Sequence, residues 1–122
     1  MPDIWRVYLV RNCCHTHPSK DKFVVIMCRD IEFMGFLINS KISKFVLKKP
    51  DLLACQVILS TSDYGFLSHD SYLDCSQIYP FGDTELVIGR ERINEKTKSE
   101  IKNVVSTAKT IEKHYKNLIL IS

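Results

Sequence analysis

Short apolar runs alternate with polar segments along most of this chain, and they are rich in β-branched and aromatic residues. Runs of this length and composition are typical of β-strands. Gly35 lies inside one run, where a glycine permits a bulge or close packing. The pattern predicts strands at residues 4–10, 23–28, 34–38, 53–59 and 71–79, and a last short strand or bridge at 85–89.

A different periodicity begins after Asn94. Asn94 is a favourable N-cap, and Glu95 in the first turn complements the positive end of a helix. The residues from 95 to 120 contain no glycine or proline, so the pattern predicts one long C-terminal helix with an apolar face that packs on the strands or on a partner chain. Steps of three and four separate the apolar residues of that face, which are Ile101, Val104, Val105, Ala108, Ile111, Tyr115, Leu118 and Ile119.

Three polar segments connect the predicted strands. Residues 11–22 form a long loop with two histidines and two lysines. Residues 39–51 are predicted to form a short helix or turn that ends before Pro50; their four lysines are either a solvated face or, as the alternative, a surface that faces RNA. Residues 60–70 carry hydroxyl and ionisable groups between two strands, which is typical both of a site and of a plain hairpin turn.

These elements predict a mainly β fold with α, a small and strongly curved β-barrel in a single domain of residues 1–122. The hydrophobic content of 45% is enough for a real core, and the net charge of +3 permits RNA binding without requiring it. No apolar run approaches the ~18 residues of a membrane helix, and the first residues do not resemble a signal peptide. We therefore expect a cytoplasmic protein with no membrane partner.

The five cysteines show no CxxC spacing. Cys28, Cys55 and Cys75 lie in apolar runs and are interpreted as reduced core residues. The adjacent pair Cys13–Cys14, followed by His15 and His17, suggests a metal site, but no second pair of ligands follows at zinc spacing. The sequence thus predicts no metal and no cofactor.

Four strings, in this order, resemble the MazF/PemK/Kid family of bacterial toxins. They are DIWRVYLV from Asp3, HTHPSKDKFVVIM from His15, QVILSTS from Gln56 and SYLDCSQIYPFGDTEL from Ser71. The resemblance covers most of the chain, although residues 31–52 match no motif. It implies an SH3-like barrel with a C-terminal helix, usually as a homodimer, and a role as the toxin of a toxin–antitoxin pair.

Toxins of this kind cleave single-stranded RNA without a metal, through attack of the ribose 2′-hydroxyl on the adjacent phosphate. The chemistry requires a base, an acid and a cation for the developing negative charge. An antitoxin would occupy the RNA groove. By position and residue type, catalytic roles are expected for His15, His17, Lys22 and Thr61, and RNA binding for Lys20, Ser62, His69 and Asp70.

The sequence also departs from the family pattern. Lys22 stands in place of arginine, which removes bidentate phosphate binding but keeps a point charge. Phe23 replaces a proline, and residues 74–76 read Asp-Cys-Ser where some members use Arg-Cys-Asp. These changes favour an alternative, a barrel without catalysis that binds RNA or a protein. A topoisomerase-binding role, as in fold relatives that poison gyrase, has no residue match.

Simpler interpretations stand beside these roles. The loop histidines are then only solvated, and Thr61 and Ser62 only bond the backbone of a turn. Tyr64 and Phe66 either stack on bases, if they are exposed, or pack in the core.

Overall fold

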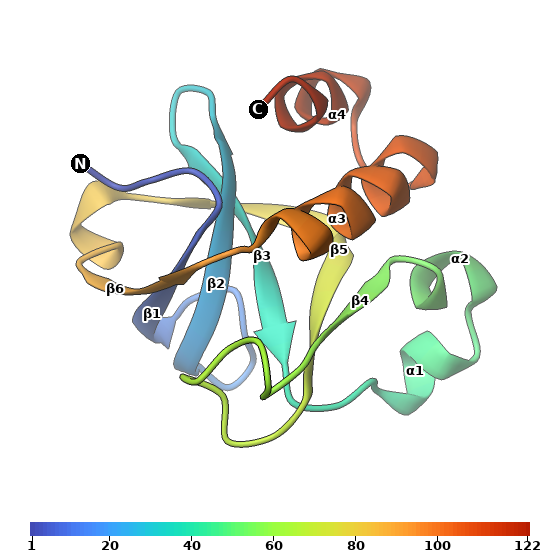
Figure 1. The fold of residues 1–122 in the computed structure, drawn as a ribbon, viewed down its shortest axis with the longest axis horizontal. Helices are drawn as coiled ribbons and strands as arrows, with labels where there is room; N and C mark the ends of the chain where they lie inside the picture. The colour runs from blue at the N-terminus through green and yellow to red at the C-terminus, as the bar shows by residue number, and fades with distance from the viewer.

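Six antiparallel strands form one strongly curved sheet in the computed structural model, which describes residues 1–122 (Figure 1). Their order across the sheet is β4-β5-β3-β2-β1-β6. The predicted mainly β fold with helices is confirmed. The strands are β1 (Arg6–Cys13), β2 (Lys20–Arg29), β3 (Phe33–Asn39), β4 (Gln56–Leu59), β5 (Ser71–Phe81) and β6 (Ile88–Arg92).

Both faces of β2 are buried. Val24 and Ile26 belong to a smaller core cluster, whereas Val25 and Met27 belong to a larger cluster that also contains residues of the C-terminal helices. Since neighbouring side chains of a strand point to opposite faces, a strand that is covered on both sides must be apolar throughout. The continuous apolar run at residues 23–28 follows from this position.

Irregular pairing bends β5. Gly35 pairs with Tyr79, but Leu37 pairs with Asp74, so β5 carries extra residues opposite a short stretch of β3. Such bulges bend a strand and increase its twist. Gly35 permits this close packing, because a Cβ atom there would lie 2.7 Å from the Val25 carbonyl oxygen and 3.0 Å from Ile26 Cδ1.

Strands extend further into polar sequence than the apolar pattern predicted. β1 ends at Cys13 and β2 begins at Lys20, which pairs with Cys13, so the loop predicted at residues 11–22 is only 14–19. β6 is Ile88–Arg92 rather than 85–89. Strand pairing continues there although most of these residues are polar, and hydrophobicity does not report such a ladder.

Two further boundaries differ from the prediction. Leu53 belongs to a helix, and β4 begins only at Gln56. Pro80 and Phe81 continue β5, and the 3₁₀ turn η1 (Asp83–Glu85) follows them. β5 continues past the point where a proline indicated a turn, since Phe81 still pairs with Phe33 and belongs to the smaller core cluster.

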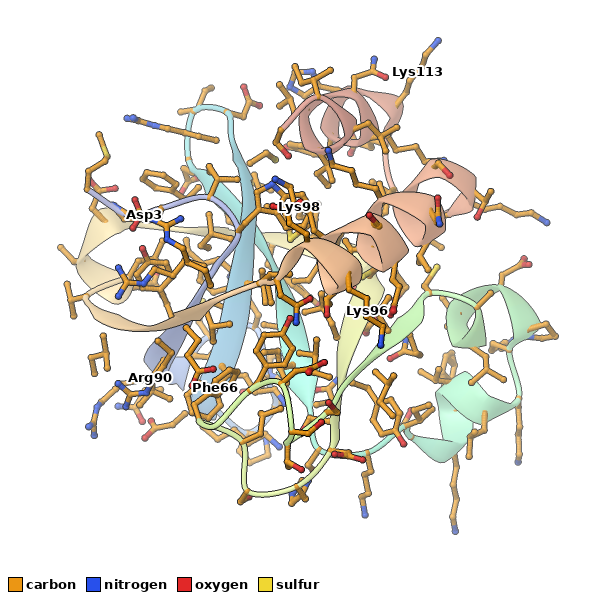
Figure 2. The ribbon with its side chains drawn as sticks, viewed as in Figure 1. Asp3, Phe66, Arg90, Lys96, Lys98 and Lys113 are labelled. Carbon is orange, nitrogen blue, oxygen red and sulfur yellow. The ribbon has the colours of Figure 1, made fainter.

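The single long C-terminal helix predicted at 95–120 is wrong. Two helices occupy these residues, α3 (Glu95–Thr107) and α4 (Lys113–Leu120), with Ala108 in an extended conformation between them. A straight helix of that length would span about 39 Å, too long to keep its apolar face on a small curved sheet. The break buries Ala108 and Ile111, while Lys113 extends into solvent (Figure 2).

The predicted helix start and the lysine-rich segment agree with the structure. The Asn94 side chain caps α3 by accepting a hydrogen bond from the Thr97 amide at 2.8 Å. The segment predicted as a short helix or turn forms two helices of one turn each, α1 (Lys44–Leu47) and α2 (Pro50–Leu53). Pro50 begins the second helix, where its missing N–H costs no hydrogen bond. No helix is long and apolar enough to cross a membrane.

All five cysteines are free thiols. Cys28, Cys55 and Cys75 are buried, as predicted, and burial raises the pKa of Cys28 to about 11. Cys13, assigned from sequence to a loop, is buried as well, whereas Cys14 is exposed. The chain therefore presents one accessible thiol.

The close approach at Gly35 predicts a specific loss of stability. Gly35→Ala is expected to lower the free energy of unfolding by about 1–3 kcal/mol, because the new methyl group forces a packed core and a backbone carbonyl apart. Urea denaturation measures the change. Gly65→Ala is the matched control, since a Cβ atom there lies 3.4 Å from Glu91 Oε1. Equal unfolding midpoints for the two variants would contradict the tight packing assigned to Gly35.

Candidate functional site

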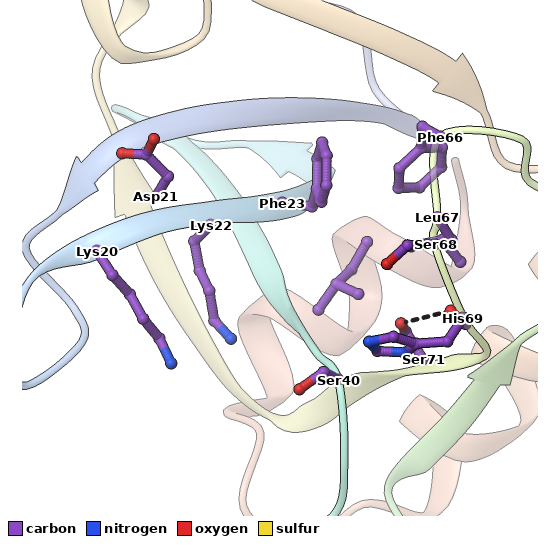
Figure 3. A pocket seen from close by; sticks show the side chains of 11 residues that line it. Lys20, Asp21, Lys22, Phe23, Ser40, Phe66, Leu67, Ser68, His69 and Ser71 are labelled. Atoms are coloured by element: carbon purple, nitrogen blue, oxygen red, sulfur yellow. Dashed lines mark hydrogen bonds between the residues drawn. The ribbon is translucent and has the colours of Figure 1, made fainter.

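A groove of about 270 Å³ opens at the end of the sheet where β2 begins and β3 ends (Figure 3). Lys20 and Lys22 lie two residues apart on β2, so they project from the same side of the strand and Asp21 from the other. The connection between β4 and β5 forms the opposite wall. The lining residues are Lys20, Asp21, Lys22, Phe23, Ile38, Ser40, Phe66, Leu67, Ser68, His69 and Ser71.

Two aromatic rings close one side of the groove. Phe23 and Phe66 meet edge to face, with ring centroids 4.8 Å apart, and Phe66 is half-buried. Tyr64 is in the core instead, where its hydroxyl accepts a hydrogen bond from the Asn94 amide at 3.1 Å. Two aromatic residues were considered for base stacking. Phe66 lines the groove and also packs against Phe23, whereas Tyr64 packs in the core and does not line the groove.

Lys22 is the half-buried cation of the groove. Its Nζ donates a hydrogen bond of 2.6 Å to Asn39 Oδ1 at the end of β3. Burial lowers the pKa of Lys22 below 10.5, and the neighbouring charge of Lys20 lowers it further, against smaller opposing effects of Cys13 and Asp74. A partly desolvated ammonium binds an anion more strongly than a solvated one does and releases its proton more readily.

His69 stands across the groove from Lys22, and its ring extends toward that lysine (Figure 3). The Nδ1 atom lies 3.0 Å from the Asp70 carbonyl oxygen, and Ser71 Oγ donates a hydrogen bond of 3.1 Å to the His69 carbonyl. These contacts fix the turn that carries the ring. The Nδ1–carbonyl contact favours the tautomer whose Nε2 is unprotonated and able to accept a proton.

A second hollow, of about 310 Å³, continues from the groove past Lys20, Lys22 and Ser40. Its floor contains Asp74, whose Oδ1 accepts hydrogen bonds of 3.0 Å from both Gln56 Nε2 and the Ser76 amide. Asp74 therefore has a structural role, because its hydrogen bonds join β5 to Gln56 of β4. Burial raises the pKa of Cys75 well above its ordinary value, so its thiol is not a nucleophile.

Three of the other predicted residues, Thr61, Ser62 and Asp70, bond within their own loop and do not line the groove. The backbone N–H and hydroxyl of Thr61 donate to Asp70 Oδ1 at 2.9 and 3.3 Å, which also occupies Asp70. The hydroxyl groups of Ser62 and Ser60 lie 3.0 Å apart.

The two predicted loop histidines are also outside the groove. His15 Nε2 lies 2.9 Å from the Pro80 carbonyl oxygen, and its ring stacks on Tyr79 with centroids 4.6 Å apart. His17 is exposed in the β1–β2 turn. Of the eight predicted site residues, the groove thus brings together Lys20, Lys22 and His69.

Sequence reasoning missed Asn39 and Ser40, which supply the hydrogen-bond partner of Lys22 and part of the groove wall. Both directly follow the apolar run at 34–38, and polar residues at the end of a central strand were the available signal. No three His, Cys, Asp or Glu side chains are grouped so that they could hold a metal ion.

Comparison with known proteins gives the fold. No protein-family model matches the sequence, and no curated protein matches it. Among solved structures, the Mycobacterium tuberculosis toxin MazF-mt6 superposes with a TM-score of 0.64 at 12% identity, over 88% of this chain and 98% of the toxin chain. The chain has a MazF-like fold. The resemblance drawn from four short strings is thereby confirmed for the architecture.

The environment of Lys22 predicts a pH effect. Because its pKa is lower in the folded chain than the ordinary 10.5, the charged side chain costs folding free energy at neutral pH. That cost disappears as the pH rises through the folded pKa towards 10.5. The free energy of unfolding should therefore rise relative to that of Lys22→Met over this interval, as urea denaturation at a series of pH values measures. A constant difference between the two proteins would contradict the lowered pKa.

Proposed function

We propose that this chain is the toxin of a toxin–antitoxin pair and that it cleaves single-stranded RNA without a metal ion. One observation carries the proposal: Lys20, Lys22 and His69 face a single groove with an aromatic wall, on a fold shared with a MazF toxin. A protein that cleaves RNA needs a cation for phosphate and a side chain that can accept a proton from the ribose hydroxyl. The groove contains both kinds of group.

RNA binding in the groove follows from its two walls. The ammonium groups of Lys20 and Lys22 pair with phosphate oxygens, and the second hollow beyond them adds Lys41 for the neighbouring phosphate. Phe66 offers a ring face on which an unstacked base can lie. A single strand fits this description because its bases are free to turn toward the aromatic wall.

In the proposed reaction, His69 Nε2 accepts the proton of the ribose 2′-hydroxyl, and the 2′-oxygen forms a bond to phosphorus. The bond from phosphorus to the 5′-oxygen breaks, and that oxygen takes a proton from the Lys22 ammonium. The products are a 2′,3′-cyclic phosphate and a 5′-hydroxyl. Proton exchange with water then returns His69 and Lys22 to their starting states, and Lys20 balances the charge that develops on the phosphate.

A second candidate is a catalytically inactive barrel that binds RNA or a protein. The observation that favours it is the hydrogen bond between Lys22 and Asn39, which RNA must compete with before the lysine can act. The absent Arg-Cys-Asp string favours it as well. The catalytic roles that the sequence suggested for His15, His17 and Thr61 are untested, and the cleavage assay below tests them.

The proposal also assigns partners. An antitoxin would occupy the groove and keep RNA from it, the toxin would act as a homodimer, and both would be present in the cytoplasm with their RNA substrate. An open reading frame for a small acidic protein beside the gene would support this assignment.

Cleavage is tested with purified protein and single-stranded RNA in the presence of EDTA, followed by mapping of the new ends. We expect 5′-hydroxyl and cyclic phosphate ends. His69→Ala should slow cleavage by about 10²–10⁴-fold, because a positioned proton acceptor is lost. His15→Ala, His17→Ala and Thr61→Ala are expected to retain most of the activity, since these side chains lie outside the groove.

The outcomes separate the candidates. RNA that binds but stays intact would exclude the nuclease and favour the inactive barrel. Cleavage that survives His69→Ala but not His15→Ala or His17→Ala would move the proton acceptor to the first loop and overturn the role of His69.

RNA affinity gives a further prediction for Lys22. Lys22→Ala should weaken binding of single-stranded RNA and reduce the slope of log K against log salt by about 0.7, as expected for one lost phosphate contact. Fluorescence anisotropy over a salt series measures both quantities. Lys113→Ala, which removes a solvent-exposed lysine on α4 (Figure 2), is the control and should leave the slope unchanged. An identical slope for the Lys22 variant would place the RNA elsewhere.

A further inference from the structure

A third hollow, of about 560 Å³, continues the surface path that begins at the RNA groove. The second hollow shares Lys20, Lys22 and Ser40 with the groove. The third hollow in turn shares Val46 and Asp74 with the second. It lies between the short helices α1 and α2, which stand out from the body of the fold (Figure 1), and β5 with the start of α4. An RNA strand whose phosphates follow the lysines therefore reaches this third hollow.

The third hollow does not suit a phosphate. No lysine, arginine or histidine lines it, and its two charged lining residues are the carboxylates Asp74 and Glu112. A phosphate would meet like charge there. The lysines that pair with phosphate line the groove and the second hollow instead. The part of an RNA strand that fits the third hollow is therefore a base.

The apolar walls of the third hollow suit the flat face of a base. Phe45 of α1 exposes 60% of its surface, and Lys49 Nζ lies 5.6 Å from the centroid of its ring. Tyr115 of α4 is half-buried. Unstacked bases lie on aromatic rings of this kind. The apolar lining consists of Met34, Phe45, Val46, Leu52, Ile78 and Tyr115.

Acceptors predominate among the polar atoms that the third hollow leaves free. Ser76 Oγ donates its proton to Asp74 Oδ1, and Thr110 Oγ1 donates its own to the Ser76 carbonyl oxygen. The Glu112 side chain makes no capping hydrogen bond at the start of α4 and no salt bridge. Free acceptors complement the edge of a ligand that presents N–H donors.

We propose that the third hollow binds a guanine base of the single-stranded RNA, an inference that rests on the proposed function and gives it a sequence preference. The Glu112 carboxylate accepts hydrogen bonds from guanine N1–H and N2–H, while the base lies against the Phe45 ring. Glu112 has this role because Asp74 already joins β5 to Gln56.

Guanine is the base that matches a carboxylate. Its Watson–Crick edge presents two adjacent N–H donors, one for each carboxylate oxygen. Adenine, cytosine and uracil each present a single donor group beside an acceptor, and that acceptor would face the second oxygen. A paired hydrogen bond of this kind discriminates strongly between bases.

The test measures binding by fluorescence anisotropy with the full chain and hexauridine strands that carry one guanine, inosine or adenine at each position in turn. Fluorine replaces the 2′-hydroxyl groups, so the strands bind without being cleaved. We expect guanine to bind about tenfold or more tightly than adenine at one position. Inosine, which keeps N1–H but lacks the N2 amino group, should bind with intermediate affinity.

The decisive variant is Glu112→Gln. An amide accepts one hydrogen bond and donates one, which matches adenine, so the adenine strand should then bind at least as tightly as the guanine strand. A merely structural role of Glu112 would lower both affinities together. Glu95→Gln makes the same change in the first turn of α3, outside all three hollows, and is the matched control that should keep the guanine preference.

Two further variants separate the base from the phosphates. Phe45→Ser should weaken binding of the guanine strand about tenfold, because the base loses its stacking surface. Lys22→Ala should weaken the guanine and adenine strands by the same factor, because phosphate contacts carry no sequence information.

The possible results distinguish this inference from the proposed function. Binding that depends on Lys22 but is equal for guanine and adenine at every position would overturn the guanine site and leave the proposed function standing. A guanine preference that is unchanged in Glu112→Gln would do the same. Absence of binding to every strand would overturn both. Binding of a lysine-rich peptide that Glu112→Gln abolishes, without any base preference, would assign the third hollow to a protein.

Discussion

Burial of β2 on both faces is the constraint on which the rest of the fold depends. Its side chains alternate between two core clusters, so both faces of the sheet must be covered, and residues of α3 and α4 help to cover the larger cluster. The curvature requires that β3 and β5 bend closely past β2, and Gly35 supplies the room. The bulge in β5 and the placement of α3 and α4 both help to exclude water from β2.

The same constraint positions the groove. Burial along β2 fades toward its start, from the fully covered Val24 through half-buried Phe23 and Lys22 to exposed Lys20. Charged residues are tolerated only at the two ends of the strand, and at its start Lys22 is close enough to the core to be partly desolvated. A cation that is held between core and solvent is well suited to bind an anion, because its charge is only partly screened. The site therefore lies where the core ends.

The apolar pattern predicted which elements form better than it predicted where each element begins and ends. Runs such as 23–28 reported strands correctly, because a buried strand has a continuous apolar signal. The strand pairings of Lys20 with Cys13 and of Arg92 with Arg6 were invisible, since an apolar pattern does not report backbone pairing of polar residues. The break at Ala108 was hidden for another reason. Steps of three and four continue through it from Val105 to Ile111, so the periodicity keeps its phase while the chain turns.

The site was predictable only in part. The contacts that sequence reasoning missed join residues that are far apart in the chain. Lys20 and Lys22 were found from their place beside an apolar strand, and His69 from its place in a loop before another. Nothing local indicated that His15 would stack on Tyr79, which is far along the chain. Thr61 is likewise bound to Asp70 at the other end of its loop. The fold of the loops decides which polar groups form hydrogen bonds with one another. Sequence spacing does not reveal these pairs.

The replacement of arginine by Lys22 is the departure with the largest chemical consequence. A guanidinium at this position would bind phosphate with two hydrogen bonds but would keep its proton at any physiological pH. An ammonium loses the second hydrogen bond, but burial lowers its pKa, and an acid with a lowered pKa gives up its proton more readily. In the proposed reaction, the lysine at this position would both attract phosphate and protonate the leaving oxygen. This compensates for the missing Arg-Cys-Asp string within the proposed reaction. The hydrogen bond to Asn39 holds the lysine at the groove in either protonation state, because a neutral amine still donates to the amide oxygen.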